Sequence, residues 1–220
     1  MFINARPYGF PFNQDLEPAK TALLVIDMQV DFLSPDGYFA KQGYDPAPLR
    51  GIITPLNQVI AAARFAGVHI VYTRQGYRAD LADMSEHERW RRHRHGMEGS
   101  TALLRGGPGF EIIPEMDVSS IDIIIDKTAN GAFTHTDFDH VLRAKGIANL
   151  MFAGVTTDVC VHTTLREAAD RNYINLLIED CCASGDAYAH AAAIHMTTVE
   201  NGVFGVVASS AQVIASLKGV

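Results

Sequence analysis

Three residues with side chains that hydrolytic enzymes use follow three separate apolar runs of this sequence. Asp27 ends the run TALLVID, Lys127 directly follows the run IDIIID, and Cys160 comes shortly after the run NLMFAGV. In an open sheet of parallel strands, ligands bind in a crevice beyond the carboxyl ends of the strands. If these runs are such strands, the sequence predicts that a carboxylate, an ammonium group and a thiol face one crevice.

Each of these groups has a chemical role in such a crevice. A thiol attacks as its thiolate, and a helix N-terminus together with the cation of Lys127 is expected to lower the pKa of Cys160. Asp27 is the candidate base that takes the thiol proton and later activates a water molecule. The backbone N–H groups of Thr156 and Cys160 are candidates for an oxyanion hole. Together they predict hydrolysis of an amide-like C–N bond through a thioester.

Taken one at a time, the same residues have structural interpretations. Asp27 can cap a strand end, an Asp–Lys pair is usually structural, and a single cysteine is most often a small hydrophobic residue. Because all three fall at strand ends of one predicted sheet, we favour the catalytic interpretation. The alternative is a non-catalytic module that holds a flavin or a nucleotide phosphate in the crevice, but no predicted strand precedes a GxGxxG or P-loop motif.

The elements that must position these residues alternate along the chain. We predict buried strands at 21–27, 67–73, 121–126, 149–155, 173–179 and 202–208, and helices at 48–67, at 136–146, after Cys160 and at 187–199. Strands without inside–outside alternation that alternate with helices indicate a parallel sheet covered on both faces. We therefore expect one α/β domain over residues 1–220, a three-layer sandwich around a doubly wound, mostly parallel sheet of about six strands.

Two segments lie outside this pattern. Residues 1–20 are expected to form an N-terminal arm, and residues 76–109 form a polar excursion rich in His, Arg and Gly. A long excursion between strands of a compact domain is usually functional, so we predict a lid or an oligomer contact. His87, His93 and His95 alternate with arginine in this excursion, which is poor spacing for zinc, and we interpret them as lid or interface residues.

The composition argues against several classes of protein. A formal net charge of −7 disfavours a nucleic acid or an anionic membrane as the main partner, and no apolar stretch reaches the ~18 residues of a membrane span. The first residues lack the basic start and apolar run of a secretory signal. Three cysteines, of which Cys181 and Cys182 are adjacent, do not make a disulfide framework. We expect a cytoplasmic protein in which Cys181 and Cys182 are structural.

Three motifs in order resemble those of the isochorismatase-like cysteine hydrolases. They are IDMQVDF (Ile26–Phe32), DKTANGAF (Asp126–Phe133) and GVTTDVCVHTTLREAADRNY (Gly154–Tyr173). The resemblance runs over nearly the whole chain. It implies a six-stranded parallel sheet flanked by helices, no cofactor, and assembly into a homodimer or homotetramer.

The same resemblance implies a catalytic triad of Asp27, Lys127 and Cys160, and a cis peptide before Thr156 that directs N–H groups at the oxyanion. Since isochorismatase itself lacks the cysteine, Cys160 groups the chain with the amidohydrolases of the family. Nicotinamidases carry a metal-binding segment after the second strand, but residues 73–83 read TRQGYRADLAD here, without closely spaced ligands. We therefore predict no metal.

The segments RPYGFPFN, DGYFAKQGYD, RADLAD, RWRR, LLIEDCCAS and GVFG most resemble biuret hydrolases and the related triuret hydrolase, and resemble ureidoacrylate amidohydrolases more loosely. These enzymes release ammonia from small ureido compounds. Where biuret hydrolases have a Gln, this chain has Glu200, whose carboxylate accepts hydrogen bonds but cannot donate them. We therefore predict triuret as the substrate, with biuret second. The candidate substrate contacts are Glu200 and Thr157, together with Phe32 and Phe133, which either line the pocket or fill the core.

Overall fold

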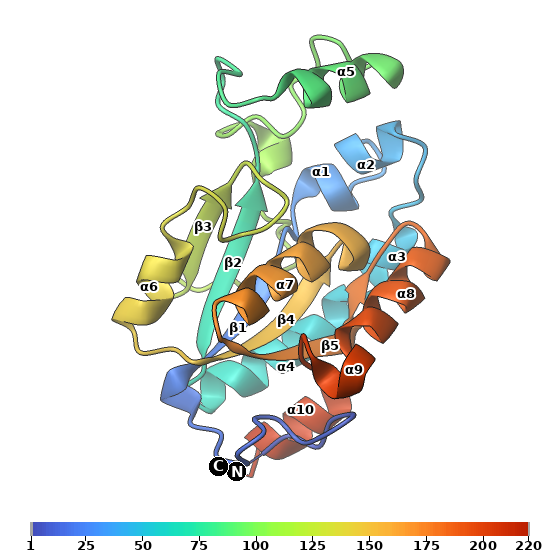
Figure 1. Ribbon diagram of the computed structural model, residues 1–220. Helices are drawn as coiled ribbons and strands as arrows, with labels where there is room; N and C mark the ends of the chain where they lie inside the picture. The colour runs from blue at the N-terminus through green and yellow to red at the C-terminus, as the bar shows by residue number, and fades with distance from the viewer. Residues whose placement is uncertain (1, 220) are drawn as a thin grey trace.

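Strands that are apolar on both faces form the centre of the molecule (Figure 1). The computed structural model describes residues 2–219. Its strands are β1 (Thr21–Ile26), β2 (His69–Gln75), β3 (Ile123–Lys127), β4 (Asn149–Val155), β5 (Ile174–Ala183) and β6 (Val206–Ala208). All neighbouring strands pair in parallel, in the order β3-β2-β1-β4-β5-β6. The chain reverses its direction of winding between β1 and β4, which is where a doubly wound sheet opens its crevice.

Alternate residues of each strand face two separate cores. Leu23 and Val25 of β1 belong to one core, which also contains side chains of α4 (Ile53–Phe65) and α10 (Ser210–Leu217). Leu24 and Ile26 belong to the other core, with side chains of α6 (Phe138–Ala144) and α7 (His162–Asp170), and Ile194 of α8 (Ala187–Thr197) packs against it. This arrangement explains the missing inside–outside alternation and confirms the three-layer α/β sandwich.

Short helices complete the chain. They are η1 (Pro18–Lys20), α1 (Val30–Leu33), α2 (Tyr38–Lys41), α3 (Ala47–Gly51), α5 (Glu86–Arg94), η2 (Pro108–Phe110), the π-helical turn η3 (Thr157–Val161) and α9 (Val199–Gly202). Among the helices of residues 2–219, none is both long enough and apolar enough to cross a membrane.

Several predicted boundaries were wrong. The helix predicted at 48–67 is two helices, α3 and α4, and it ends at Phe65, two residues before Gly67, whose φ of 83° favours glycine just beyond a helix end. Strand β5 continues to Ala183 after a register shift on β4, so Cys181 and Cys182 lie within the strand and not after it. Their thiols are buried in the two opposite cores, which agrees with a structural role. Helix α10 was not predicted.

The N-terminal arm runs back along the edge of the sheet. Ile3 pairs with Phe10 in a small antiparallel bridge, and both side chains are fully buried. Arg6 pairs with Val207 of β6 through two backbone hydrogen bonds of 2.9 Å, and its guanidinium binds Glu179. The arm therefore continues the sheet beyond its last strand.

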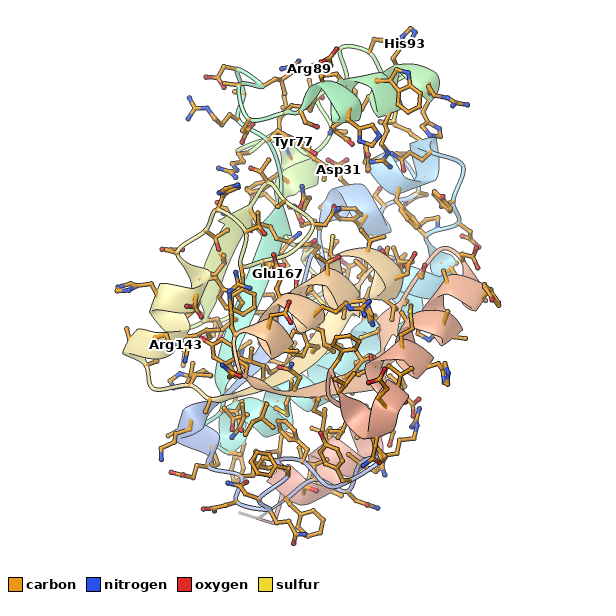
Figure 2. The ribbon with its side chains drawn as sticks, viewed as in Figure 1. Asp31, Tyr77, Arg89, His93, Arg143 and Glu167 are labelled. Atoms are coloured by element: carbon orange, nitrogen blue, oxygen red, sulfur yellow. The ribbon has the colours of Figure 1, made fainter. Side chains whose placement is uncertain are left out.

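The excursion at 76–109 carries α5, which lies above α1 and α2 at the top of Figure 1. Buried Asp31 fastens this segment, because its carboxylate accepts hydrogen bonds from the N–H groups of Leu103 (2.6 Å) and Tyr38 (3.2 Å). Figure 2 shows Asp31 and Tyr77 between the sheet and α5. The polar excursion is thus anchored by a buried carboxylate from the first motif.

Candidate active site

The end of β3 and the loops that follow β1 and β4 bring the three predicted catalytic residues together. Asp27 follows β1 with a left-handed φ of 52°, Lys127 is the last residue of β3, and Cys160 lies in η3 after β4. The side chains of Asp27 and Lys127 are completely buried. Their charged atoms, Oδ2 and Nζ, are 2.8 Å apart. The crevice predicted from the sequence is therefore a buried ion pair beside a thiol.

Lys127 has more acceptors than the carboxylate alone. Its Nζ donates to Oε1 of Gln75 (2.8 Å) and to the carbonyl oxygens of Ala129 (3.2 Å) and Asn130 (3.0 Å). An ammonium group has three hydrogens, so Nζ is shared among these acceptors and Oδ2 of Asp27. Within residues 2–219, Oδ2 of Asp27 accepts no directed hydrogen bond. One lone pair of the carboxylate therefore remains available beside Cys160.

The turn that carries Cys160 is fixed on both sides. The peptide between Val155 and Thr156 is cis, as the family resemblance implies. The hydroxyl of Thr164 donates to the Cys160 carbonyl (2.7 Å) and accepts from the N–H of Ala132 (3.1 Å), which ties the turn to the loop after β3. Single π-helical turns of this kind are frequent at functional sites.

Close approach of two strands requires glycine at the start of this turn. Gly154 has a φ of 113°, and a Cβ atom added there would collide with the backbone of Ile26 in β1. Since Asp27 follows Ile26, this contact brings the base and the thiol turn next to each other. The close approach of Asp27 and the turn of Cys160 thus requires glycine at position 154.

The charges of the site act on one another. Burial raises the pKa of the Cys160 thiol to about 12, because it outweighs the opposing effect of Lys127 and is reinforced by Asp27. Burial alone would lower the pKa of Lys127, but Asp27 and Cys160 outweigh it and the pKa is raised. The pKa of Cys160 is therefore shifted upward by burial, opposite to the lowering that the sequence predicted, whereas the pKa of Lys127 is shifted in the direction that keeps its charge.

A cavity of about 270 Å³ opens above Cys160. Its base includes Thr156, Cys160 and Gln75, and α5 contributes Glu88 and Arg91 to its wall. The other lining residues are aromatic or small and polar, and include Phe32, Tyr38, Phe39, Gln42, Tyr44, Tyr77, Asn130, Asp158, Val159, Ser184, Gly185, Asp186 and Ala189. Both predicted oxyanion residues therefore lie at the base of a pocket that suits a small polar molecule.

Of the other predicted contacts, only Phe32 lines the cavity, and its ring also belongs to the core. Phe133 does not, because its N–H is bound to Glu167 of α7 (3.0 Å; Glu167 is labelled in Figure 2) and its ring packs against Phe138 and Tyr173. Thr157 does not either, since it is fully buried with its hydroxyl 2.8 Å from Nδ1 of His190. These two assignments were wrong.

Glu200 lies far from this chemistry in the fold. It is exposed in α9, in the connection that leads into β6, and is not among the residues of the cavity. In a parallel sheet, the connection that enters a strand lies at the edge opposite the carboxyl ends. The prediction that Glu200 faces the substrate was therefore wrong within this chain.

Four polar residues at or beside the site, Gln29, Asp31, Gln75 and Arg91, were not predicted from the sequence. Gln29 accepts from the N–H of Gln75 (2.7 Å) and donates to the carbonyl of Gln75 (3.0 Å), which holds the residue that contacts Lys127. Gln29 and Asp31 both belong to the motif IDMQVDF, so the signal was present in the sequence. Arg91, in contrast, was one of several arginines in a polar helix, and nothing in the sequence distinguished it.

The histidines of the excursion lie outside the cavity. His87 stacks on Trp90, His93 contacts Glu98 at the outer surface of α5 (Figure 2), and His95 ends the helix. Across residues 2–219, no group of three or more His, Cys, Asp or Glu side chains is placed to hold a metal ion.

Comparisons with known proteins agree with this arrangement. Residues 21–212 match the isochorismatase domain. Two relatives named ureidoacrylate amidohydrolase RutB are 31% identical in Acinetobacter baylyi (82% of this chain, 78% of the relative) and 34% identical in Rhizobium rhizogenes (75% and 71%). Among solved structures, a cysteine hydrolase from Pseudomonas syringae pv. phaseolicola is 28% identical with a TM-score of 0.79 (93% of this chain, 95% of that chain). N-carbamoylsarcosine amidase from Thermoplasma acidophilum is 28% identical with a TM-score of 0.67 (87% and 96%). Since the matched domain spans most of the sequence, the chain belongs to the isochorismatase family.

Proposed function

We propose that this protein is a cysteine amidohydrolase that cleaves a C–N bond of a small ureido compound and releases ammonia. The observation that carries the proposal is the buried Asp27–Lys127 pair next to Cys160 at the base of a cavity. The relatives named ureidoacrylate amidohydrolase and N-carbamoylsarcosine amidase support the same reaction class.

In the proposed mechanism, the Cys160 sulfur attacks the carbonyl carbon of a terminal carbamoyl group. Because the pKa of the resting thiol is about 12, its proton moves to Asp27 as the carbon–sulfur bond forms. The N–H groups of Thr156 and Cys160 stabilise the oxyanion. Asp27 then returns the proton to the leaving nitrogen, the C–N bond breaks and ammonia departs.

The second half of the reaction uses the same groups. Asp27 takes a proton from a water molecule, the water oxygen attacks the thioester, and the sulfur leaves with the proton that Asp27 holds. Lys127 stays charged throughout, held by Gln75 and two carbonyl oxygens. Its charge balances the carboxylate at the start and the thiolate character of the sulfur during attack.

The choice among substrates rests on the shared carbamoyl group. Triuret, biuret and ureidoacrylate all end in one, and each is small enough for a cavity of this size. Glu200 does not distinguish triuret from biuret, because it is exposed outside the cavity. We keep triuret and biuret as the first candidates and ureidoacrylate as the alternative.

The test is an ammonia-release screen with these three compounds. The wild-type protein should release ammonia from at least one of them. Cys160→Ser should lose turnover, because a hydroxyl is far less ionised than a thiol at neutral pH. Cys181→Ser is the matched control and should retain activity. Cys160→Ser with more than a few per cent of the wild-type rate would show that another residue attacks.

A further inference from the structure

Asp158 lies two residues before Cys160, and its side chain lines the same cavity. One of its carboxylate oxygens, Oδ1, is buried and receives no hydrogen bond from residues 2–219. Within the same residues, no Lys, Arg or His lies within ion-pair distance of the carboxylate. Asp158 as a whole is half-buried at the cavity wall, and its buried oxygen needs a hydrogen-bond donor that residues 2–219 do not supply.

The other carboxylates in the cavity wall have their donors. Glu88 accepts from the hydroxyl of Tyr38 (3.2 Å) and from the guanidinium groups of Arg91 (2.7 Å) and Arg92 (3.2 Å). Asp186 caps α8 by accepting two backbone N–H groups at its first turn. Among the described carboxylates that line the cavity, the unmet demand for hydrogen-bond donors is therefore specific to Asp158.

The nearest histidine does not compensate the charge. Nδ1 of His190 is 2.8 Å from the hydroxyl of Thr157, and its imidazole is not within ion-pair distance of Asp158. Burial lowers the pKa of His190, although Asp158 and Glu179 act in the opposite direction. A neutral imidazole leaves the carboxylate of Asp158 as an unbalanced negative charge at the wall, next to the nucleophile.

A ligand in the cavity can balance this charge with its own N–H groups. We propose that Asp158 makes the cavity selective for ureides whose end distant from the scissile bond is an amide, and against ureides that end in a carboxylate. The proposal rests on the proposed function for the position of the scissile carbamoyl group over Cys160. An amide end donates hydrogen bonds to Asp158, whereas a carboxylate end meets a like charge there.

Arg91 is the group that would favour ureides that end in a carboxylate. It is the one cation among the cavity-lining residues that the structure describes, and it could receive a substrate carboxylate. However, its side chain is 47% exposed and already paired with Glu88 at 2.7 Å. The charge of Arg91 is neutralised by Glu88 and screened by solvent, whereas Asp158 is half-buried and has no cationic partner among residues 2–219.

The test measures binding separately from turnover. Biuret and N-carbamoylglycine are of similar size, and they end in an amide and a carboxylate respectively. Calorimetry measures the dissociation constants of both compounds on Cys160→Ala and on three double variants. Each double variant combines Cys160→Ala with Asp158→Asn, Asp170→Asn or Arg91→Gln. Asp170 is exposed at the end of α7, so Asp170→Asn is the matched control.

We expect Cys160→Ala to bind biuret more tightly than N-carbamoylglycine. Asp158→Asn should lower this ratio about tenfold or more, whereas Asp170→Asn leaves it unchanged. Arg91→Gln should change it less than Asp158→Asn does. A ratio that Asp158→Asn leaves unaltered, a larger effect of Arg91→Gln, or failure to bind either compound would overturn the inference.

Turnover distinguishes this inference from the proposed function. A wild-type protein that binds biuret through Asp158 but releases no ammonia from any ureide would keep the inference and refute the proposed function. A protein that releases ammonia through Cys160, but shows no preference between the two classes of ureide either before or after Asp158→Asn, would support the proposed function and overturn the inference. Thermal unfolding of each variant checks that the near-isosteric change leaves the fold intact.

Discussion

Replacing Asp27 by Asn should make the enzyme slower and its cysteine more reactive. Burial raises the pKa of the Cys160 thiol to about 12, and the carboxylate of Asp27 reinforces this rise. In a medium of effective dielectric constant near 20, a unit charge at contact distance contributes at most about 4 kcal/mol, or about three pKa units. Removal of the Asp27 charge should therefore lower the pKa of Cys160, with Lys127 as the counter-ion of the thiolate.

The assay is alkylation by iodoacetamide at pH 8, followed by mass spectrometry of the cysteine peptides. A fall of about three pKa units, the upper bound, would raise the thiolate fraction about a thousandfold, but the less basic thiolate is a weaker nucleophile, so labelling should accelerate severalfold and by at most about 30- to 60-fold. Ammonia release should fall by about 10² or more, because the base is lost. Cys181 and Cys182 are buried and serve as internal controls.

Asp126→Asn is the matched variant. Asp126 precedes Lys127, is exposed and pairs with Arg74 at 2.8 Å, so its loss should leave the labelling rate within about twofold. If Asp27→Asn is alkylated no faster than the wild type, Asp27 does not control the proton of the resting thiol. If turnover also persists, another group is the base.

Gln75→Leu removes an acceptor of the Lys127 ammonium, and kcat should fall roughly 10- to 100-fold in ammonia-release kinetics; an unchanged kcat would show that the other acceptors suffice. Arg92→Leu removes a buried guanidinium that contacts the rings of Tyr38 and Tyr77 and anchors residues 76–109. Limited proteolysis of this segment should therefore be faster than in the exposed control Arg94→Leu, and equal cleavage would show that Arg92 does not anchor it. Glu200→Gln should leave the triuret-to-biuret ratio of kcat/KM within about twofold of the wild-type ratio, since the side chain is exposed outside the cavity. A tenfold change would show that Glu200 contacts the substrate. Dialysis against a chelator should leave turnover intact, and a loss that zinc restores would refute the prediction of no metal.

The elements were predictable because their hydrophobic patterns are simple. Runs such as residues 149–155 are apolar on both faces, and that pattern alone indicates a parallel sheet between helices. The sheet in turn assigns Asp27, Lys127 and the turn of Cys160 to one edge. Boundaries were less certain, because β5 continues through Cys181 and Cys182 by a register shift that leaves no local signal.

Side-chain roles beyond the triad were harder to predict. Glu200 was predicted to contact the substrate from the resemblance to biuret hydrolases. Its place in the connection that enters the last strand already put it at the edge of the parallel sheet opposite the crevice. The pKa of Cys160 depends on how completely the thiol is buried, and sequence does not give burial at a turn. Asp158 was quoted within a motif, but its lack of a partner is a property of the three-dimensional surroundings.

The N-terminal arm also bears on how the protein behaves at high concentration. The two backbone hydrogen bonds between Arg6 and Val207 cover the free edge of β6, a strand of three residues. An uncovered edge strand offers unpaired N–H and C=O groups to another chain and invites aggregation. Removal of the arm, or a purification tag that displaces it, should therefore promote self-association through β6 while the hydrolytic groups at the carboxyl edge stay in place.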